Sequence, residues 1–535
     1  MTFDRGDLVY GYSPTSGNLT SITAPGSNTL SYTYDGSLPK SVTWAGSVQG
    51  SVGVGYNNDL RVTSMTVNGA NSLAFGYDHD GLLTAAGAIG IKRQAQHGLP
   101  ERDSVGTVKS AWSYTSRAAL GGYTATSGAT TLFQTGYVRD SLDRISQLTE
   151  TIGGTTQVQA FTYDSAGRLR EVRRDGVLTA TYEYDLNGNR THLTTPSGTV
   201  TGTYDAQDRL TSYGTASYTY DALGSLTAVT LADGTHISYV VDGRNRRVGK
   251  RVDGVLVQGF LYAGQLSPIA EVDGNQQVVS RFVYGTRANV PAYMTKGGTT
   301  YRLITDHLGS VRLVVNATDG TVAQRIDYDE FGRITQNTAP GFQPFGYAGG
   351  LLDDHTGLTR FGARDYDAAP GRWTAKEPLG FSGGYANLYA YVGSDPVNFI
   401  DPSGSSPEGC GDVPKAPPGV KIDNNIKEAQ KFLDPSRYLG DWNYKKLGRP
   451  ATETESAEYE DFGNFNYGAT MAAAGYDEET ALRIAGLVQI ASKTSKPEYN
   501  VPWGKPPYGD QQGDYDQIRK GYRYYECKFG GTRWF

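Results

Sequence analysis

A short motif recurs along most of the chain: a run in which Tyr, Thr and Val alternate, then Tyr-Asp, then a turn that contains Gly. The phrases FTYDSAGRL and YEYDLNGNR are clear copies, and successive clear copies lie about 20 residues apart, enough for two strands and their connections. Alternating side chains point to opposite faces of a strand, and Asp and Gly favour tight turns. Each copy therefore predicts a β-hairpin.

A single hairpin is only marginally stable in water, so the hairpins are expected to pair edge to edge in one long sheet. The 69 Gly and 38 Tyr residues fit this pattern, since Gly adopts positive φ and Tyr favours strands. The copies are degenerate between about residues 90 and 135. The aspartates of the copies are interpreted as turn residues rather than ligands: Asp35, Asp78, Asp164, Asp185, Asp205, Asp221, Asp242 and Asp329.

The overall charge and hydropathy limit the classes of partner. The formal net charge is −6, so the whole molecule does not match a nucleic-acid backbone, and any such contact must be local. No stretch approaches the ~18 apolar residues of a membrane helix, so no membrane span is expected. The first residues lack a secretory signal and open in the middle of the repeat, which predicts that an upstream part is missing.

The repeat units resemble the YD repeats of Rhs proteins and of the C subunits of insecticidal toxin complexes, over residues 1–404. The resemblance implies a mainly β fold, in which the repeat sheet spirals into a hollow, cocoon-like shell that encloses a C-terminal toxin. The repeat shell itself is expected over residues 1–327.

The segment from Tyr328 to Gly404 contains FGYAGGLLDDHTGLTRFGARDYDAAPGRW, then EPLG, and ends in DPSG. It resembles the Rhs-associated core domain, whose pattern ends in two DPxG motifs. The resemblance implies an intramolecular aspartic protease, in which one ionised carboxylate activates water and a protonated neighbour donates a proton. The matching acids are Glu377 and Asp401, and the cut is expected between Gly404 and Ser405.

Two departures from the family pattern keep a second interpretation open. Glu377 is one methylene longer than the usual Asp, and Ser405 stands where the family usually has Leu. The alternative is a core domain that ends the shell without cutting the chain. Asp395, in the phrase SDPVN, is a spare acid that is more typical of a turn.

The composition changes after Gly404. Residues 405–418 are rich in Pro and Gly and are interpreted as a linker. Within 419–535, apolar residues recur at helical spacing, as in DEETALRIAGLVQIAS at 477–492, which predicts a small α-helical domain. The phrases DFGNFNYGA and PYGD resemble the bacterial toxin 44 family. That resemblance implies a delivered effector, interpreted as a nuclease, and a cognate immunity protein as its partner.

Residue types limit the chemistry of this tail. All 6 histidines of the chain lie before Gly404, which excludes His-based triads, His metal sites and a His general base there. Cys410 and Cys527 suffice for one disulfide but make a poor zinc site. A nuclease without His would use carboxylates to hold Mg²⁺ and Arg or Lys to neutralise the transition state. The candidate residues are Asp461, Asn464, Asn466, Asp510, Arg519 and Arg523, with Lys445 and Lys446.

Two alternatives for the function stay open. Glu460 and Asp461, with the rings of Trp442, Tyr444 and Trp503, suit cleavage of a glycan such as peptidoglycan. The other alternative is a non-enzymatic YD-repeat protein, adhesive or structural, at the cell surface with an inert tail.

The sequence as a whole predicts the C-terminal part of an Rhs-type polymorphic toxin, produced in the cytoplasm, secreted and delivered into competitor cells. It predicts a YD-repeat shell, a core domain at 328–404 with a self-cleavage site, a linker and an α-helical toxin domain at 419–535. The toxin is expected to hydrolyse RNA or DNA, with Mg²⁺ as its candidate cofactor. The expected partners are the immunity protein and a secretion apparatus, of type VI or another type, reached through the missing upstream region.

Overall fold

The computed structural model describes most of the first 405 residues and a few residues of the tail. The described residues are 2–3, 6–95, 98–116, 118–213, 216–217, 228–231, 233–380 and 385–405, together with Asn464, Tyr467, Gly468, Ala469, Leu482, Ala485, Ile518 and Arg519. The chain divides into two compact units. The first comprises Met1–Gly76, Leu83–Pro407 and Arg533–Phe535, and the second comprises Tyr77–Leu82 and Glu408–Thr532.

Asp164 shows how the motif makes a hairpin between β17 (Thr155–Tyr163) and β18 (Leu169–Arg174). Its Oδ1 accepts the N–H groups of Ala166 and Arg168 at 2.9 and 3.0 Å, and its Oδ2 accepts Arg168 Nε at 2.7 Å. Gly167 donates to Asp164 O at 3.0 Å and has a φ of +84°, a left-handed conformation that favours Gly. We call this arrangement the repeat turn: an Asp whose Oδ1 accepts the backbone N–H groups of the residues two and four positions later.

The repeat turn recurs along the first unit. The same pair of backbone N–H contacts to an aspartate Oδ1 is made at Asp140, Asp185, Asp205, Asp242, Asp273, Asp306 and Asp329. The interpretation of the repeat aspartates as turn residues is therefore confirmed wherever the motif and the repeat turn coincide. The sequence motif did not include Asp140, Asp273 and Asp306, which directly follow Arg, Val and Thr rather than Tyr.

Two described aspartates of the motif, Asp78 and Asp35, differ from this pattern. Asp78 accepts the N–H of Leu82 through Oδ1 at 2.8 Å. Asp35 is the last residue of β5 (Asn28–Asp35), where it pairs with Leu38 across a tighter turn. Asp221 lies outside the described residues.

The tyrosine that precedes the turn ties neighbouring strands together. Tyr163 Oη donates to Ile145 O at 2.6 Å, beyond the last backbone pairing between β16 (Ile145–Ile152) and β17. Tyr184 Oη donates to Leu169 O at 2.9 Å in the same way. Each hydroxyl satisfies a carbonyl that the strand ladder leaves open, which explains why the motif pairs Tyr with Asp.

Strands β3 to β23 form one sheet that closes on itself, so β23 neighbours β3. Strands continue regularly through residues 90–135, where the motif is degenerate. The bounds not yet given are β3 (Val9–Tyr12), β4 (Leu19–Ala24), β6 (Leu38–Ala45), β7 (Gly50–Tyr56), β8 (Val62–Val67), β9 (Ala70–Tyr77), β10 (Leu83–Ala86), β11 (Ile89–Arg93), β12 (Pro100–Val105), β13 (Val108–Tyr114), β14 (Leu120–Ser127), β15 (Thr130–Arg139), β19 (Val177–Tyr184), β20 (Arg190–Thr195), β21 (Gly198–Tyr204), β22 (Leu210–Tyr213) and β23 (Ala216–Ser217), with a short 3-10 helix η1 (Pro25–Ser27).

The strands that follow form separate sheets. An 11-stranded sheet contains β24 (Ala228–Thr230), β25 (His236–Val241), β26 (Arg247–Val252), β27 (Val255–Tyr262), β28 (Pro268–Val272), β29 (Val278–Val283), β30 (Tyr293–Lys296), β31 (Thr299–Thr305), β32 (Val311–Asn316), β33 (Val322–Tyr328) and β34 (Ile334–Asn337). A 4-stranded sheet contains β35 (Leu351–Leu352), β36 (Thr359–Phe361), β37 (Arg364–Asp367) and β38 (Arg372–Trp373), near the 3-10 turns η2 (Tyr347–Gly349) and η4 (Val392–Ser394). At the start of the chain, β1 (Thr2–Phe3) pairs with β2 (Gly6–Asp7).

The expectation of one long sheet is therefore wrong for the described residues. The first sheet closes through β23 and β3, which leaves no free strand edge for β24 to extend. Later strands bury their apolar faces against the first sheet instead.

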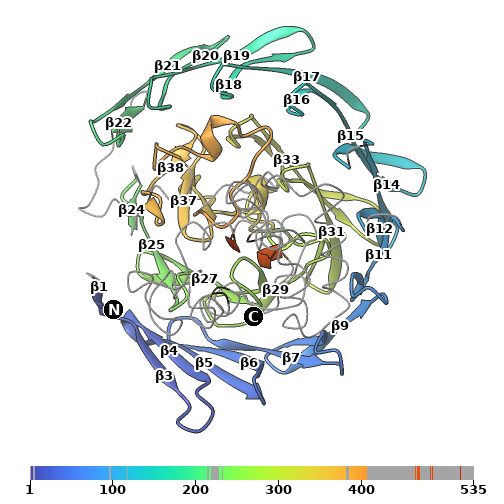
Figure 1. Cartoon of the computed structure of the whole chain (residues 1–535), viewed down its shortest axis with the longest axis vertical. Coiled ribbons are helices and arrows are strands. Elements are labelled where there is room, and N and C mark those ends of the chain that lie inside the picture. Colours follow the sequence, from blue (N-terminus) through green and yellow to red (C-terminus); the bar gives the residue numbers. More distant parts are fainter. Residues whose placement is uncertain are drawn as a thin grey trace, which may run out of the picture. The chain divides into compact units, whose positions relative to one another are not determined.

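Figure 1 shows β3 to β22 following one another around the rim, with β25 to β38 nearer the centre. Phe133 and Ile152 of the closed sheet share one buried cluster with Ile304 and Leu313 of the second sheet. This packing buries apolar side chains of both sheets, which is the main force holding layers together.

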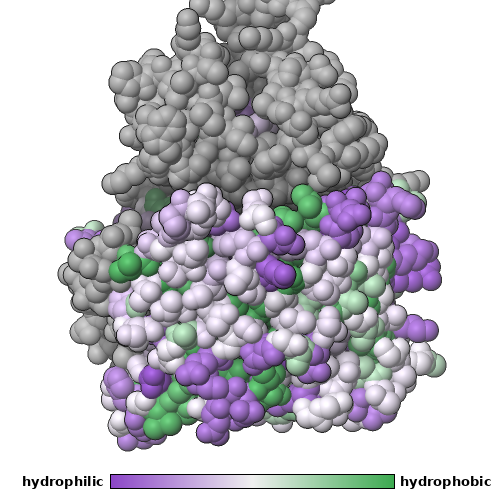
Figure 2. All heavy atoms as spheres, turned by 90° about the horizontal axis from the view of Figure 1, so that it is seen from below, coloured by the Kyte–Doolittle hydropathy of each residue, from purple (hydrophilic) through white to green (hydrophobic). Residues whose placement is uncertain are grey.

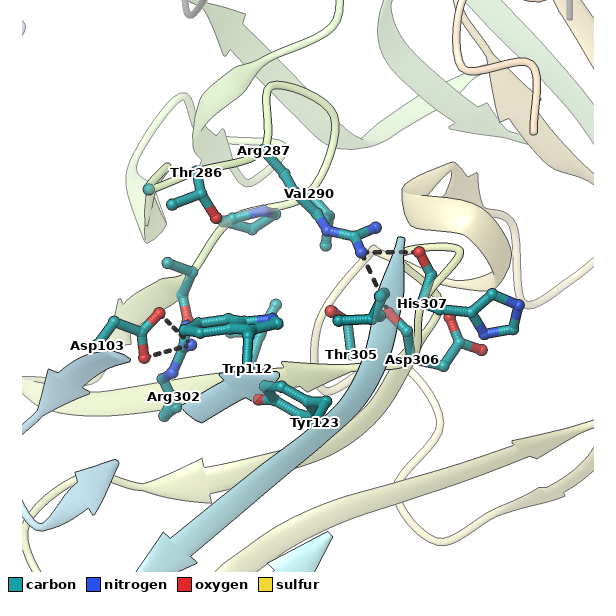
Figure 3. A pocket seen from close by; sticks show the side chains of 15 residues that line it. Asp103, Trp112, Tyr123, Thr286, Arg287, Val290, Arg302, Thr305, Asp306 and His307 are labelled. Atoms are coloured by element: carbon teal, nitrogen blue, oxygen red, sulfur yellow. Dashed lines mark hydrogen bonds and ion pairs between the residues drawn. The ribbon is translucent and has the colours of Figure 1, made fainter. Parts of the chain in front are cut away.

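Buried ion pairs also join the two sheets, as Figure 3 shows for β12 and β31. Arg302 Nη2 donates to Asp103 Oδ1 and Oδ2 at 2.9 and 2.8 Å, beside the ring of Trp112. Arg287 Nη2 donates to His307 O at 2.7 Å. Burial raises the pKa of the Asp103 carboxyl and lowers that of the Arg287 guanidinium. These charges line a small cavity, and the contacts that they make are structural.

The described part of the chain is mainly antiparallel β. Hydrophilic and intermediate residues cover most of the described face seen in Figure 2, and hydrophobic residues there form small groups. Among the described residues, no helix has the length and apolar character needed to cross a membrane. The eight described residues of the tail are all helical, whereas the α-helical domain as a whole stays a prediction.

Candidate self-cleavage site

The last described residues before the tail form a turn at 401–405, which we call the terminal turn. Asp401 is 1% exposed, and its Oδ1 accepts Ser403 Oγ at 2.9 Å and the N–H of Ser405 at 3.2 Å. Gly404 donates to Asp401 O at 3.2 Å and has a φ of +64°. The expected point of cleavage therefore lies in an ordered turn, in which the carboxylate of Asp401 accepts the N–H of Ser405.

A hairpin of the four-stranded sheet holds the terminal turn. The N–H of Ala363, between β36 and β37, donates to Ser403 O at 2.8 Å. A Cβ added to Gly404 would lie 2.3 Å from Phe361 O, so only Gly fits this close approach. Phe361 itself packs against the rings of Tyr366 and Trp373 in a buried aromatic cluster. The site therefore rests on a rigid support.

Arg364, the first residue of β37, is the centre of the site. Its side chain is 3% exposed, and its Nε donates to Gly404 O at 2.6 Å. Its Nη2 donates to Glu377 Oε2 at 2.7 Å and to Asp401 Oδ2 at 3.3 Å. The guanidinium carbon lies 4.1 Å from the centre of the Trp373 ring, an arrangement that favours a cation. Burial lowers the pKa of Arg364, and the charges of Glu377 and Asp401 oppose that shift.

Glu377 lies in a turn of its own, formed by the EPLG motif. Gly380 donates to Glu377 O at 2.9 Å, and the N–H of Leu379 donates to Glu377 Oε1 at 3.1 Å. Because Glu377 Oε2 and Asp401 Oδ2 both accept from Arg364 Nη2, they lie within 6.0 Å of each other, the sum of 2.7 and 3.3 Å. The longer side chain of Glu377 therefore reaches the same cation as Asp401.

The peptide between Gly404 and Ser405 is contacted on both sides. Its carbonyl oxygen faces a buried cation, Arg364, and its N–H faces a carboxylate, Asp401. A cation at the oxygen stabilises the negative charge that develops when a nucleophile attacks the carbonyl carbon. A carboxyl group at the nitrogen is placed to protonate the departing amine.

The structure brings together the predicted residues Glu377, Asp401, Gly404 and Ser405. The spare acid Asp395 lies elsewhere: its Oδ1 and Oδ2 accept Asn398 Nδ2 at 2.9 and 3.0 Å. Burial raises the pKa of Asp395 to about 6, despite the hydrogen bonds from Asn398.

Most of the candidate toxin residues fall outside the described residues. Asn464 is helical and buried, and Arg519 is helical and half-buried. No group of three or more His, Cys, Asp or Glu side chains spaced to hold a metal ion occurs among the described residues. The remaining candidates lie outside the described part: Asp461, Asn466, Asp510, Arg523, Lys445, Lys446, Glu460, Trp442, Tyr444 and Trp503.

Sequence reasoning missed Arg364 and Ser403. A signal for Arg364 was present, because it stands in the aromatic phrase RFGARDY, and a cation that is buried among rings needs an anionic partner. Ser403 carries no comparable signal, since a Ser in a turn is common. Its contact with Asp401 becomes visible only in the folded turn.

A closed sheet of repeat hairpins followed by a buried terminal turn defines a repeat-shell protein. The chain belongs to the teneurin YD-shell family, whose model matches residues 1–397. A second family model, bacterial toxin 44, matches residues 425–527. The resemblances of the repeat units to YD repeats and of the tail to bacterial toxin 44 are confirmed. The resemblance of residues 328–404 to the Rhs-associated core domain stays a prediction.

Curated relatives match the chain over part of their length. Human teneurin-1 is 30% identical over 268 residues, which cover 45% of this chain and 10% of that protein. Zebrafish (Danio rerio) teneurin-3 is 29% identical over 297 residues, 49% of this chain and 11% of that protein. The tRNA3(Ser)-specific nuclease WapA of Bacillus spizizenii is 26% identical over 276 residues, 50% of this chain and 11% of that protein. The chain thus spans about a tenth of the length of these relatives.

Solved structures share the fold. The TcdB2-TccC3-Cdc42 structure matches 75% of this chain and 25% of its own with a TM-score of 0.62 at 17% identity. The TcdB2-TccC3 structure gives 0.61 at the same identity and covers 75% of this chain and 26% of its own. The chain thus combines a match to a YD shell with a match to a bacterial toxin domain that follows it.

Proposed function

We propose that this chain is part of a polymorphic toxin that cuts its own backbone between Gly404 and Ser405 and so separates an effector from its YD shell. One observation carries the proposal: Arg364 Nε contacts the carbonyl oxygen of that peptide at 2.6 Å, while Asp401 Oδ1 accepts its N–H at 3.2 Å. The two groups face opposite ends of one peptide bond.

Each charged group has a role in the proposed cleavage. Arg364 stabilises the oxyanion as the carbonyl carbon becomes tetrahedral. Asp401 takes the proton of the nucleophile and returns one to the departing nitrogen of Ser405. Glu377 holds the guanidinium in place through Nη2 and offsets part of its desolvation, because an unpaired buried cation is costly. The reaction consumes one water molecule overall.

The full-length chain tests this cleavage directly. Purified wild-type protein is expected to yield two fragments, and intact mass and N-terminal sequencing are expected to place Ser405 at the new N-terminus. Asp401→Asn is expected to remain one polypeptide. Asp205→Asn, a change in an exposed repeat turn, serves as the matched control and is expected to cleave like the wild type. An intact wild-type chain, identical in mass to Asp401→Asn, would reject the proposal.

The released effector is proposed to be a nuclease that inhibits competitor cells, with an immunity protein as its partner. The match of 425–527 to bacterial toxin 44 supports the toxin, and the relative named as a tRNA-specific nuclease supports nucleic acid as the substrate class. Mg²⁺ is the proposed cofactor. The protein is proposed to be made in the cytoplasm and delivered into target cells by a secretion apparatus.

The substrate is tested by incubating the self-cleaved full-length preparation with total RNA, with plasmid DNA and with purified peptidoglycan, each with Mg²⁺ or with EDTA. Degradation of RNA or DNA that EDTA abolishes is the expected result. Degradation of peptidoglycan alone would instead support glycan hydrolysis, and no degradation of any substrate would leave the shell without an enzymatic cargo of these kinds.

A further inference from the structure

Two serine hydroxyls connect the expected cleavage point to Asp401. Ser405 Oγ lies 3.0 Å from Ser403 Oγ, and Ser403 Oγ donates to Asp401 Oδ1 at 2.9 Å. The N–H of Ser405 contacts both groups, at 3.2 Å from Ser403 Oγ and 3.2 Å from Asp401 Oδ1. The hydroxyl that follows the cleavage point therefore has a continuous path for its proton to a buried carboxylate.

The hydroxyl of Ser405 is separated by few covalent bonds from the carbonyl carbon at the expected cleavage point. Its Oγ is separated from the carbonyl carbon of Gly404 by only the nitrogen, Cα and Cβ of Ser405, so its attack closes a five-membered ring. A hydroxyl is a weak nucleophile until a base takes its proton, and Asp401 is in position to do so through Ser403. The oxygen that becomes negative already faces Arg364 Nε at 2.6 Å.

We propose, on the basis of the self-cleavage proposed above, that Ser405 is the attacking nucleophile and that cleavage proceeds through an ester. The bond from Ser405 Oγ to the carbonyl carbon of Gly404 forms, and the bond from that carbon to the nitrogen of Ser405 breaks. The hydroxyl proton passes through Ser403 to Asp401, which delivers it to the departing nitrogen, its neighbour at 3.2 Å.

Water then completes the reaction. It hydrolyses the ester between the Gly404 acyl group and Ser405 Oγ, which leaves a carboxylic acid on Gly404 and restores the hydroxyl of Ser405. No oxidant or further reactant is required. Asp401 acts once as base and once as acid, so one buried carboxylate is sufficient for the acyl shift, and Glu377 serves to position Arg364.

The chain contains its own comparison turn. Residues 195–199 read TPSGT, so a Pro-Ser-Gly sequence again precedes a hydroxyl residue, Thr199. In this exposed turn, Ser197 Oγ lies 2.8 Å from Thr195 Oγ1, which replaces the aspartate. Thr199 instead pairs with Thr194, at 2.9 Å between their hydroxyls. The same local sequence without a carboxylate at its first position is expected to be inert.

The test uses the full-length chain and follows fragment formation by intact mass. Ser405→Ala is expected to lower the rate by more than about 10³-fold, the scale on which loss of an attacking serine acts. Ser405→Cys and Ser405→Thr are expected to cleave, because each keeps a nucleophile at that position. Neutral hydroxylamine is expected to trap the ester and leave a hydroxamate on Gly404 of the wild type.

Ser403 is a positioning residue in this scheme, since it passes the proton and does not touch the reacting carbon. Ser403→Ala is expected to slow cleavage about 10² to 10⁴-fold, the usual contribution of proton transfer, and Ser403→Thr to restore it. Ser197→Ala is the matched control and is expected to leave the rate unchanged. Circular dichroism checks whether each variant is folded.

The outcomes separate the two proposals. If Ser405→Ala cleaves at the wild-type rate and hydroxylamine forms no hydroxamate, water attacks directly: the ester route is overturned while self-cleavage stands. If the wild type and every variant remain intact, self-cleavage and the ester route are overturned together. A hydroxamate at Gly198 would show that the local sequence alone is sufficient, and this too would overturn the role given to Asp401.

Discussion

The repeat turn at Asp164 and the terminal turn at Asp401 have nearly the same backbone. In each, an Asp Oδ1 accepts the N–H four residues later, at 3.0 Å from Arg168 and 3.2 Å from Ser405. In each, a Gly three residues after the Asp has a positive φ and donates to the Asp carbonyl. The local turn therefore does not distinguish a structural aspartate from a candidate catalytic one.

The difference lies in the arginine. The partner of Asp164 is Arg168, which belongs to the same turn and is 22% exposed. The partner of Asp401 is Arg364, which comes from a separate strand, is 3% exposed and also contacts the carbonyl of Gly404. An arginine from outside the turn can reach the backbone of the turn as well as its carboxylate. Burial then strengthens both contacts, because the surrounding dielectric is low.

Among the variants that compare the two turns through their arginines and aspartates, the largest effect is expected when Arg364 is removed. Arg364→Gln withdraws the donor at the Gly404 carbonyl and is expected to reduce self-cleavage about 10² to 10³-fold, as loss of an oxyanion donor does. Arg168→Gln, in the repeat turn, is expected to leave the rate unchanged. Fragment formation measured over time checks both.

Arg364→Lys keeps the positive charge but loses the planar set of donors, so it tests whether the charge alone is sufficient for cleavage. We expect self-cleavage of Arg364→Lys to remain slow. Full activity of Arg364→Gln in a folded protein would show that the cation only supports the fold.

The repeat turns also differ among themselves in how deeply their Arg–Asp ion pairs are buried. Arg246 and Asp242 are 2% and 3% exposed, whereas Arg209 and Asp205 are 35% and 27% exposed. Asp242→Asn keeps the Oδ1 acceptor but leaves a buried cation unpaired, with an expected loss of about 3 to 5 kcal/mol of unfolding free energy. Asp205→Asn is expected to cost about 1 kcal/mol or less. Denaturant unfolding of the two variants measures this difference, and equal losses would contradict it.

Asp395 adds a pH-dependent contrast. Its pKa is raised from 3.8 to about 6 by burial, so between these values the folded state keeps a proton that the unfolded state has lost. Stability from this group is therefore fully present below pH 4 and falls by about 3 kcal/mol as pH rises through 6. Asp395→Asn is expected to remove that slope.

Asp164 is expected to act in the opposite direction, because its pKa is lowered. Burial raises it, but hydrogen bonds from Arg168 and Ala166 outweigh that effect. Its contribution to stability is lost as pH falls. Thermal unfolding of Asp395→Asn and the wild type at pH 4.5 and 7.5 measures the first slope, and identical slopes for the two proteins would contradict the prediction.

The smallest effect is expected at the glycine of the repeat turn. Gly167 has a φ of +84°, and the nearest atom to an added Cβ is 4.0 Å away. Gly167→Ala therefore meets no steric overlap and is expected to cost about 1 kcal/mol, from backbone strain alone. Denaturant unfolding checks the value. A loss as large as that of Asp242→Asn would contradict this prediction, because it would require close packing around Gly167.

The hairpins could be predicted from the sequence because their information is local. Tyr163, Asp164 and Gly167 each act within one hairpin or on a neighbouring strand, and their spacing is visible in the printed chain. The closure of the first sheet could not be predicted, because it depends on the accumulated curvature of many strands rather than on a motif.

The candidate site was predictable in part. The acids Glu377 and Asp401 stand in motifs that mark them, and Gly404 and Ser405 follow directly in the chain. Arg364 lies well before Asp401 in the sequence and joins the site only when β37 packs beside the terminal turn. Long-range contacts of this kind have no local signature.

The sequence by itself determined a repeat of Asp-centred turns and the position where that repeat ends. Only the tertiary structure decided that the turn at Asp401 differs from the turn at Asp164. The physical reason is that a β-turn is set by neighbours along the chain. The charge that surrounds its peptide bonds is set instead by Arg364, a residue that folding brings from another strand into a dry interior.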